Sequence, residues 1–183
     1  ESDSKAGSML ESIYRQSCDK SPVFAHMNFV NAELAKISVN SFVTMRISFA
    51  NQLARICDQL PESDVDVITS AIGLDTRIGR KYLKGAVSFG GPCFPRDNVA
   101  FSRMAVQLGT EAPIALATDK MNLDYLSYLA DKIVGQVPKS GHVAMLGMSY
   151  KPDTGVTEQS PSIFLVHKLL AKGVAVSAYD PLA

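Results

Sequence analysis

The feature that most constrains the fold is a long stretch, from Asn31 to Leu60, that contains neither proline nor glycine. Its apolar residues recur mostly every three or four positions, which is the spacing of one face of a helix. We therefore predict a single helix over 31–60, roughly 40 Å long at a rise of 1.5 Å per residue. The apolar face of such a helix must be covered, either by the rest of the chain or by a partner subunit. The sequence leaves both alternatives open.

Further helical patterns flank this stretch, with residues typical of helix starts and stops at their ends. They comprise "SDSKAGSMLESIYRQ" with a cap at Ser2, Asp3 or Ser4, "PESDVDVITSAIG" with Ser63 as its cap and Gly73 as its stop, "PRDNVAFSRMAVQLG" with Pro95 near its start and Gly109 at its end, and the segment from Pro113 to about Gly135. The stretch "LDTRIGRKYLKGAVSFGG" has no sustained period and is predicted to be a loop. Residues 1–137 are thus predicted to form a mainly α domain.

The pattern changes after residue 137. "HVAMLG" is predicted to be a short buried strand, "SPSIFLVHKLLAKG" a helix and "VAVSAYD" a second strand. Strand, helix and strand in this order predict a right-handed parallel βαβ unit, and therefore an α/β domain over 138–183. Two parallel strands are too few to be stable alone, so we expect this domain to be truncated in the chain.

Composition excludes several classes of function. The eighteen basic and eighteen acidic residues cancel, so no basic field suggests a nucleic acid or a membrane surface as a partner. We find no apolar run of membrane-spanning length, and the start "ESDSKAG" lacks signal-peptide character. Cys18, Cys57 and Cys93 are odd in number and widely spaced, which argues against a disulfide framework or a zinc site. Free thiols, no bound metal and a cytoplasmic location are the expectation.

Cys93 stands apart from the other two cysteines because it lies in "FGGPCFPRD", just before a predicted helix start. Backbone N–H groups at a helix start would stabilise a thiolate and lower the pKa of Cys93, which makes the thiol a nucleophile. Gly90 and Gly91 allow positive φ and keep side chains off an approaching substrate. Asp97 is close enough in sequence to position a water molecule or take a proton. The alternative is a structural cysteine in a tight turn, which composition alone favours.

Two lysines form weaker signals. Lys36 and Asn40 are four residues apart on the predicted long helix and so share a face. The lysine either extends its stem along apolar neighbours or aims its ammonium group, with the amide beside it, at a developing oxyanion. Lys151, in "GMSYKPDTG", follows the first strand of the βαβ unit, where phosphates are commonly held. A full G-x-G-x-x-G is missing there, so this crossover is not a dinucleotide fingerprint.

Together these segments resemble the UDP-glucose/GDP-mannose dehydrogenase family. The matching stretches are "NAELAKISVNSFVTMRISFANQLA", "AIGLDTRIGRKYL", "FGGPCFPRD" and "LGMSYKPDTG". The resemblance implies that 1–137 is a central dimerisation domain with a catalytic cysteine loop. It implies that 138–183 begins a Rossmann-like, nucleotide-sugar-binding domain, and that the family's N-terminal NAD domain is missing. Oxidation of the C6 alcohol of a nucleotide sugar to a carboxylate, with NAD as cofactor, is the implied activity. The isolated chain is expected to be inactive.

The resemblance also implies roles for individual residues. Cys93 would form a thiohemiacetal and then a thioester, Lys36 and Asn40 would stabilise oxyanions, and Asp97 would activate water. The substrate-binding residues implied are Arg77, which would reach the site of the neighbouring subunit, Tyr82, Lys84, Phe89, Gly90, Gly91, Phe94 and Lys151. A homodimer through helix 31–60 is implied as well.

The chain departs from the family pattern at two positions. Arg96 stands where many family members have a lysine. An arginine keeps the positive charge but presents a planar guanidinium group in place of an ammonium group. Arg96 is the candidate NAD contact within this chain. Glu158 replaces an arginine that holds the NAD pyrophosphate, which puts that contact in doubt. The "FGG-C-FP" form favours UDP-glucose over N-acetylated sugars, with GDP-mannose next. Alternatives are a β-hydroxyacid-type dehydrogenase, which needs no cysteine loop, and a dimerisation module without activity.

Overall fold

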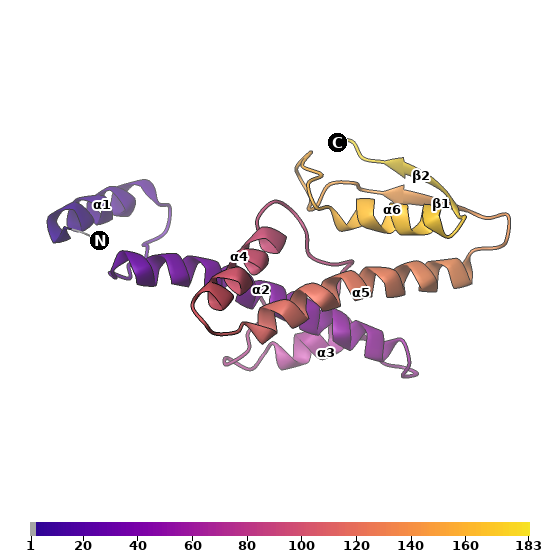
Figure 1. The fold of residues 1–183 in the computed structure, drawn as a ribbon, viewed down its shortest axis with the longest axis horizontal. Helices are drawn as coiled ribbons and strands as arrows, with labels where there is room; N and C mark the ends of the chain where they lie inside the picture. The colour runs from indigo at the N-terminus through magenta and orange to yellow at the C-terminus, as the bar shows by residue number, and fades with distance from the viewer. Residues whose placement is uncertain (1–2) are drawn as a thin grey trace. The chain divides into compact units, whose positions relative to one another are not determined.

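The computed structural model describes residues 3–183 (Figure 1). These residues form two compact units, and the division falls between Val39 and Asn40. Helix α1 (Ser4–Ser17) belongs to the first unit, and its N-cap is Asp3, one of the three predicted candidates. The Asp3 side chain accepts a hydrogen bond of 2.7 Å from the backbone N–H of Lys5, which satisfies one unpaired donor of the first turn. No residue of α1 is buried.

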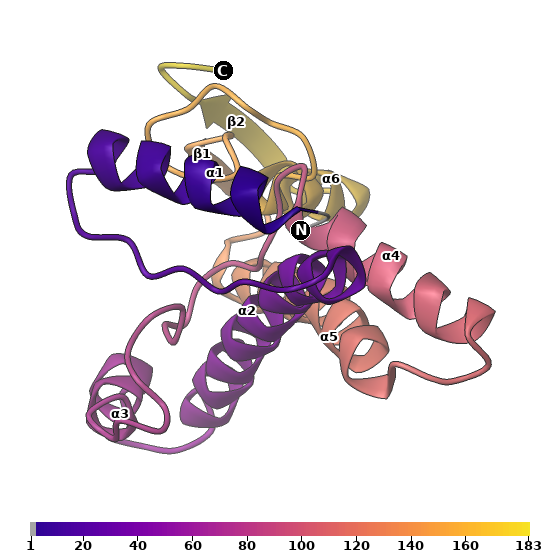
Figure 2. The same cartoon turned by 90° about the vertical axis from the view of Figure 1, so that its left-hand side faces the viewer.

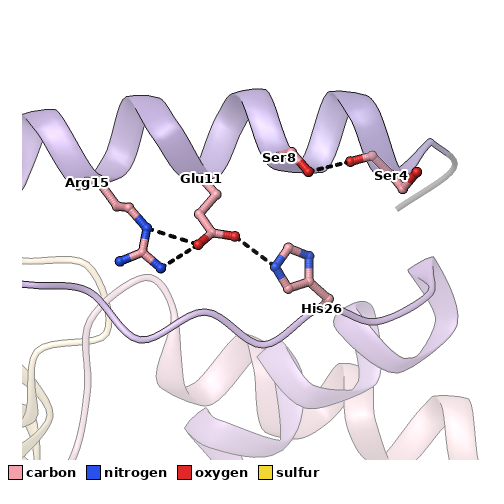
Figure 3. Close-up of polar contacts among 5 residues, drawn as sticks. All are labelled: Ser4, Ser8, Glu11, Arg15 and His26. Carbon is pink, nitrogen blue, oxygen red and sulfur yellow. Dashed lines mark hydrogen bonds and ion pairs between the residues drawn. The ribbon is translucent and has the colours of Figure 1, made fainter.

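A three-residue cluster ties the segment after α1 back to that helix. Figure 3 shows Glu11 between Arg15 and His26, with one carboxylate oxygen toward each of the two side chains. The distances are 2.9 Å from Arg15 Nε to Glu11 Oε1 and 3.0 Å between His26 Nε2 and Glu11 Oε2. The hydrogen bond from Arg15, followed by that from His26, lowers the pKa of Glu11. The first unit is thus held in part by exposed charges.

Helix α2 (Phe29–Cys57) starts two residues before the predicted helix and ends three residues before its predicted end. Its buried residues are small or polar: Thr44, Ser48, Ala50 and Asn51. Large apolar side chains of the same helix, among them Phe42, Phe49 and Ile56, are exposed instead. The second unit, residues 40–183, therefore does not cover the apolar side of α2, as a central core helix would require.

Helices α3 (Val65–Ile72), α4 (Phe94–Gln107) and α5 (Pro113–Gln136) follow in the second unit, close to their predicted ranges. The predicted cap of α3 was wrong. Asp64, not Ser63, accepts hydrogen bonds from the first turn, because the Ser63 hydroxyl already donates to the carbonyl oxygens of Cys57 and Leu60. The segment between α3 and α4 contains neither helix nor strand, as predicted (Figure 2).

The chain ends in the predicted βαβ unit. Strands β1 (His142–Leu146) and β2 (Ala175–Tyr179) pair in parallel from His142↔Ala175 to Leu146↔Tyr179, and α6 (Pro161–Ala171) connects them. The mainly α fold with a partial parallel α/β part is therefore confirmed. The core is centred on Leu126 and Ala130 of α5 and Leu165 and Leu169 of α6, with partly buried side chains of both strands against it.

The prediction that β1 is buried was wrong: three of its five residues are exposed and the other two are only partly buried. The two kinds alternate along the strand, and Leu146 is 78% exposed. Val143 and Met145 pack against the core formed with α5 and α6, whereas the second unit places no layer on the opposite face. Because α5 contributes to the core of the βαβ unit, the domain boundary at 137/138 stays a prediction.

Candidate active site

Cys93 lies at the N-cap of α4, as the sequence predicts. Its carbonyl oxygen accepts the hydrogen bond of 2.8 Å from the N–H of Asp97 that closes the first turn. The side chain makes no capping hydrogen bond, and the residue is exposed rather than buried in a turn. An accessible thiol at a helix start is a setting in which cysteines act as nucleophiles. Cys18 is also exposed, so it is not a buried structural residue, and Cys57 is partly buried.

A cavity of about 340 Å³ adjoins Cys93. It brings together six of the residues predicted for the site: Tyr82, Phe89, Gly90, Cys93, Phe94 and Lys151. The ring of Phe94 makes edge-to-face contacts with Tyr82 and Phe89, each with ring centroids 6.4 Å apart. Tyr82 has a φ of +59°, a left-handed conformation that is uncommon for a bulky residue and that recurs at functional sites. Aromatic rings and a lysine thus surround the thiol.

Gly90 and Gly91 have a packing role that the sequence did not reveal. A Cβ at Gly90 would lie 2.1 Å from the carbonyl oxygen of Gln159, and one at Gly91 would lie 2.4 Å from the ring of Tyr150. Only Gly91, with a φ of +82°, has the positive φ expected of both. The two glycines therefore let the segment after β1 approach the cysteine loop, and Gly90 in addition lines the cavity.

Asn40 and Asp97 meet across two helices. Asn40 Nδ2 donates a hydrogen bond of 2.6 Å to Asp97 Oδ2, and Arg96 Nε lies 3.4 Å from Asp97 Oδ1. Asp97 is 5% exposed, so these contacts offset the cost of burying its carboxylate. Lys36 lies one turn before Asn40 on α2, in the first unit. The pairing of Asn40 with Asp97 is thus a structural finding, while the roles of both residues and of Lys36 stay predictions.

Arg77 and Lys84 lie apart from this cavity. Arg77 forms an ion pair with Asp75, at 2.6 Å between Nη2 and Oδ2, and its side chain is 87% exposed. The hydrogen bond from Arg77 lowers the pKa of Asp75. Lys84 lines a separate hollow with Arg80 and residues of α3. The structure therefore does not bring these two predicted substrate contacts to Cys93 within the second unit.

A second, larger cavity of about 490 Å³ lies at the carboxyl ends of β1 and β2. It shares Ser88, Tyr150 and Lys151 with the cavity beside Cys93, so the two adjoin. Carboxyl ends of parallel strands are the usual ligand position in open α/β sheets. The Lys151 ammonium group lies 5.5 Å from the centroid of the Tyr150 ring, which places a positive charge at the shared border.

Asp180 fixes the two loops that line this larger cavity. Its Oδ2 accepts hydrogen bonds from the N–H groups of Met148 and Ser149, at 2.7 and 2.9 Å. Its Oδ1 accepts from the N–H groups of Leu182 and Ala183, at 2.8 and 3.1 Å. The Leu182 hydrogen bond, followed by those from Ser149 and Met148, holds the pKa of Asp180 well below its usual range. The loops are therefore tied to one ionised carboxylate.

Sequence reasoning missed several residues of the site. Tyr150 and Ser88, which border both cavities, and Ile47, which lines the one beside Cys93, were not predicted. Tyr150 could have been found, because it directly precedes Lys151 in a stretch already singled out. Ile47 gives no local signal, since its place depends on how α2 packs.

Residues 3–183 contain no group of three or more histidine, cysteine or acidic residues arranged to hold a metal, and no helix among them is long and apolar enough to span a membrane.

Two family models match the chain. Residues 30–124 match the central domain of the UDP-glucose/GDP-mannose dehydrogenase family, and residues 144–183 match its UDP binding domain. The first match contains the Cys93 loop, and the second contains both strands of the sheet except the first two residues of β1. The two cavities thus fall within segments that have family counterparts.

Individual relatives agree with the family models. The chain is 34% identical over 182 residues to UDP-glucose 6-dehydrogenase TuaD of Bacillus subtilis, covering 98% of this chain and 38% of that protein. It is 35% identical over 185 residues to the putative UDP-glucose 6-dehydrogenase YtcA of the same organism, covering 100% of this chain and 42% of that protein. The solved structure of a UDP-glucose dehydrogenase from Pyrobaculum islandicum superposes with a TM-score of 0.84 at 34% identity, over 99% of this chain and 41% of the other.

The chain therefore spans about two fifths of the length of these relatives. Within that length the fold, the order of the segments and the sequence all correspond. The chain belongs to the UDP-glucose/GDP-mannose dehydrogenase family.

Proposed function

We propose that this chain is the thiol-bearing and nucleotide-binding part of an enzyme that oxidises the C6 alcohol of a nucleotide sugar to a carboxylate. One observation carries the proposal: the accessible thiol of Cys93 lines a cavity that adjoins a larger one at the carboxyl ends of the parallel strands. The larger cavity would hold the nucleotide, in the segment that matches a UDP binding domain. The smaller one would hold the sugar with its C6 atom at the sulfur.

Four residues of the chain would each have a role in this reaction. The C6 alcohol would first lose a hydride and its hydroxyl proton to give an aldehyde. The Cys93 thiolate would add to the aldehyde carbon, and the carbonyl oxygen would take up a proton, which gives a thiohemiacetal. Loss of a second hydride from C6 and of the hydroxyl proton would convert this to a thioester, and attack by water would release the carboxylate and the thiol. Asp97, held by Asn40, would orient that water, and Lys36 with Asn40 would stabilise the oxyanions.

NAD, when bound, would accept the two hydrides. The crossover after β1 has no dinucleotide fingerprint, because Gly147 is followed by no further glycine before Gly155, and the acidic Glu158 comes next. Arg96 is occupied with Asp97, although its side chain is 68% exposed and could also face a phosphate. We therefore assign the main NAD site to a part of the enzyme outside this chain, and expect the isolated chain to be inactive.

UDP-glucose is the proposed substrate, with GDP-mannose as the second candidate. The names of the two relatives and of the archaeal structure favour the first. Tyr82, Phe89, Gly90 and Phe94 would contact the sugar, and Lys151 at the border of the cavities would face the diphosphate. A β-hydroxyacid-type dehydrogenase is disfavoured, because such an enzyme needs neither the cysteine loop nor a UDP binding domain.

A homodimer through α2 is part of the proposal. Phe42, Phe49 and Ile56 are exposed and seven residues apart, which is a repeat suited to pairing with a second helix. Arg77, exposed on the loop after α3, would then reach the site of the neighbouring subunit. Sedimentation of the chain and of Phe49→Glu tests this: we expect a dimer that the substitution converts to monomer, whereas a monomeric wild-type chain would contradict the pairing.

The experiment that tests the reaction is product analysis with the full-length protein, NAD+ and a panel of nucleotide sugars. We expect uronate from UDP-glucose, and loss of that product in Cys93→Ser. Cys18→Ser is the matched control, since it removes another exposed thiol from the first unit. Carboxylate formation at the wild-type rate by Cys93→Ser would refute the role of the thiol. Activity on GDP-mannose alone would correct the substrate.

A further inference from the structure

Two side chains of α5, Asp119 and Asn122, hold the two ends of the cysteine loop. The Asn122 amide forms a pair of hydrogen bonds with the backbone of Phe89: Oδ1 accepts from the Phe89 N–H and Nδ2 donates to the Phe89 carbonyl oxygen, both at 2.9 Å. The Ser88 hydroxyl donates to the Asn122 carbonyl oxygen at 2.8 Å. This end of the loop is therefore fixed in both position and orientation.

The other end of the loop is held through Asn98, which is fully buried. Asn98 Nδ2 donates to Asp119 Oδ1 at 2.9 Å and to Thr44 Oγ1 at 3.0 Å, so both of its amide hydrogens are used. Thr44, also fully buried, belongs to α2. Asn98, which follows Asp97 on α4, is thus hydrogen-bonded both to Asp119 of α5 and to Thr44 of α2.

Asp119 and Asn122 are three residues apart on a helix and share a face. The segment 89–98 is anchored to that face near both of its ends, and Cys93 lies between the anchors. Asn98 and Asn122 are buried, whereas Asp119 is partly buried. Hydrogen bonds of buried polar groups favour one geometry, because a shift leaves a buried donor or acceptor unsatisfied. A misplacement of about 1 Å can cost a reaction about a hundredfold in rate.

From this arrangement we infer that Asp119 and Asn122 are positioning residues, which set the place of the Cys93 thiol relative to the bound sugar. The inference rests on the proposed function for its chemistry, but the anchoring itself does not. Neither residue touches the cavity beside Cys93, and each acts through the backbone or side chain that it holds.

Four substitutions separate positioning from general stability. Asn122→Asp keeps the acceptor for the Phe89 N–H but points a carboxylate oxygen at the Phe89 carbonyl. Asp119→Ala removes the acceptor for Asn98, whereas Asp119→Asn keeps a carbonyl oxygen there. Burial raises the pKa of Asp119, so the neutral amide also avoids a desolvation cost. Lys120→Ala is the control, because Lys120 lies between the two residues and forms an exposed ion pair with Asp124.

The first measurement is the rate of iodoacetamide alkylation in the 183-residue chain, read by peptide mass spectrometry. Cys18 serves as the exposed reference and Cys57 as a reporter of unfolding, since it is partly buried. We expect Cys93 to react at least about threefold more slowly in Asn122→Asp and Asp119→Ala, with Cys57 unchanged. Asp119→Asn and Lys120→Ala should match the wild type. If Cys57 is alkylated faster in Asn122→Asp, that variant is partly unfolded, and the comparison of Asp119→Ala with Asp119→Asn then tests the inference.

The second measurement is steady-state kinetics of the full-length protein. We expect Asn122→Asp and Asp119→Ala to lower kcat by about tenfold or more with little change in KM, because a displaced thiol affects the reaction and not the binding. Cys93 alkylation within about twofold of wild type in both variants, or equal losses in Asp119→Ala and Asp119→Asn, would overturn the inference. If the wild-type protein oxidises no nucleotide sugar, the proposed function fails, and the alkylation rates still test the anchoring.

Discussion

The side-chain amide of Asn40 donates a hydrogen bond of 2.6 Å to the buried carboxylate of Asp97, which joins α2 to the first turn of α4. This contact links residues that are 57 positions apart in the sequence. Asp97 lies one helical turn after Cys93 on α4. The next residue, Asn98, donates a hydrogen bond to Thr44, one turn further along α2. The start of α4 is therefore fixed by side chains, and not only by its own backbone.

Asn40→Ala is expected to destabilise the chain, because a buried carboxylate loses a donor. Hydrogen bonds to charged groups contribute about 1.5–3 kcal/mol, and we expect a loss of this size in the free energy of unfolding, measured with urea. Gln52→Ala, an exposed change on the same helix, should stay within about 0.5 kcal/mol of wild type. Equal effects of the two substitutions would show that the contact with Asp97 adds nothing to stability.

Alanine at Gly90 and alanine at Gly91 are both expected to destabilise the chain, for different reasons. The new Cβ at Gly90 would meet the Gln159 carbonyl oxygen, which is backbone, whereas alanine at Gly91 would have to adopt a φ of +82° and would also meet the Tyr150 ring. We expect a loss of about 1–3 kcal/mol or more for Gly90→Ala, from overpacking.

Gly135→Ala is the matched control for these two substitutions. Gly135 lies in α5, and its Cβ would meet nothing within 4 Å. Alanine there should therefore stabilise the chain by about 0.5–1 kcal/mol. Urea midpoints of the three variants test these expectations. A Gly90→Ala protein as stable as wild type would mean that the segment at Gln159 does not pack against the cysteine loop as described.

Asp180 should give the chain a characteristic acid dependence. Its pKa in the folded state lies below the value of about 3.9 that an unfolded aspartate has. Its contribution to stability is therefore fully present above the unfolded value and is lost as the pH falls toward the folded value. Between pH 5 and pH 3, approximately, the urea midpoint should fall more steeply in wild type than in Asp180→Asn. Gln52→Ala, an exposed change that alters no titratable group, should keep the wild-type slope, and parallel slopes in all three proteins would contradict this prediction.

Arg46 should control access to the loop that carries Arg77. Its guanidinium group donates to the carbonyl oxygens of Ile78 and Gly79, at 2.6 and 2.5 Å. A lysine keeps the charge but not the planar fork, so Arg46→Lys should let this loop open more often. We expect trypsin to cut after Arg77 or Arg80 about threefold faster or more than in wild type. Arg55→Lys is the control on the same helix, and unchanged cleavage in Arg46→Lys would show that the fork is not what holds the loop.

The sequence predicted most of the elements because their signals are local. The spacing of apolar residues predicted α1 and α2, and start and stop residues predicted the other helices. Gly109 follows α4 with a φ of +73°, and Pro95 and Pro161 lie at helix starts. The position of Cys93 at the N-cap of α4 followed from the same local signals. The wrong prediction of Ser63 as the N-cap of α3 shows the limit of such local signals. Ser63 and Asp64 are both good caps, and the choice depended on the end of the preceding helix.

What the sequence determined by itself was therefore the secondary structure, the βαβ unit and a cysteine at a helix start. Only the tertiary structure decided which residues meet: Asn122 with Phe89, Tyr150 with Gly91, and Asn40 with Asp97. It also showed that three of the five residues of β1 and the apolar side of α2 are uncovered within the second unit. The physical reason is that periodicity records which side of an element is apolar, whereas the partner of that side is set by packing between segments far apart in the chain.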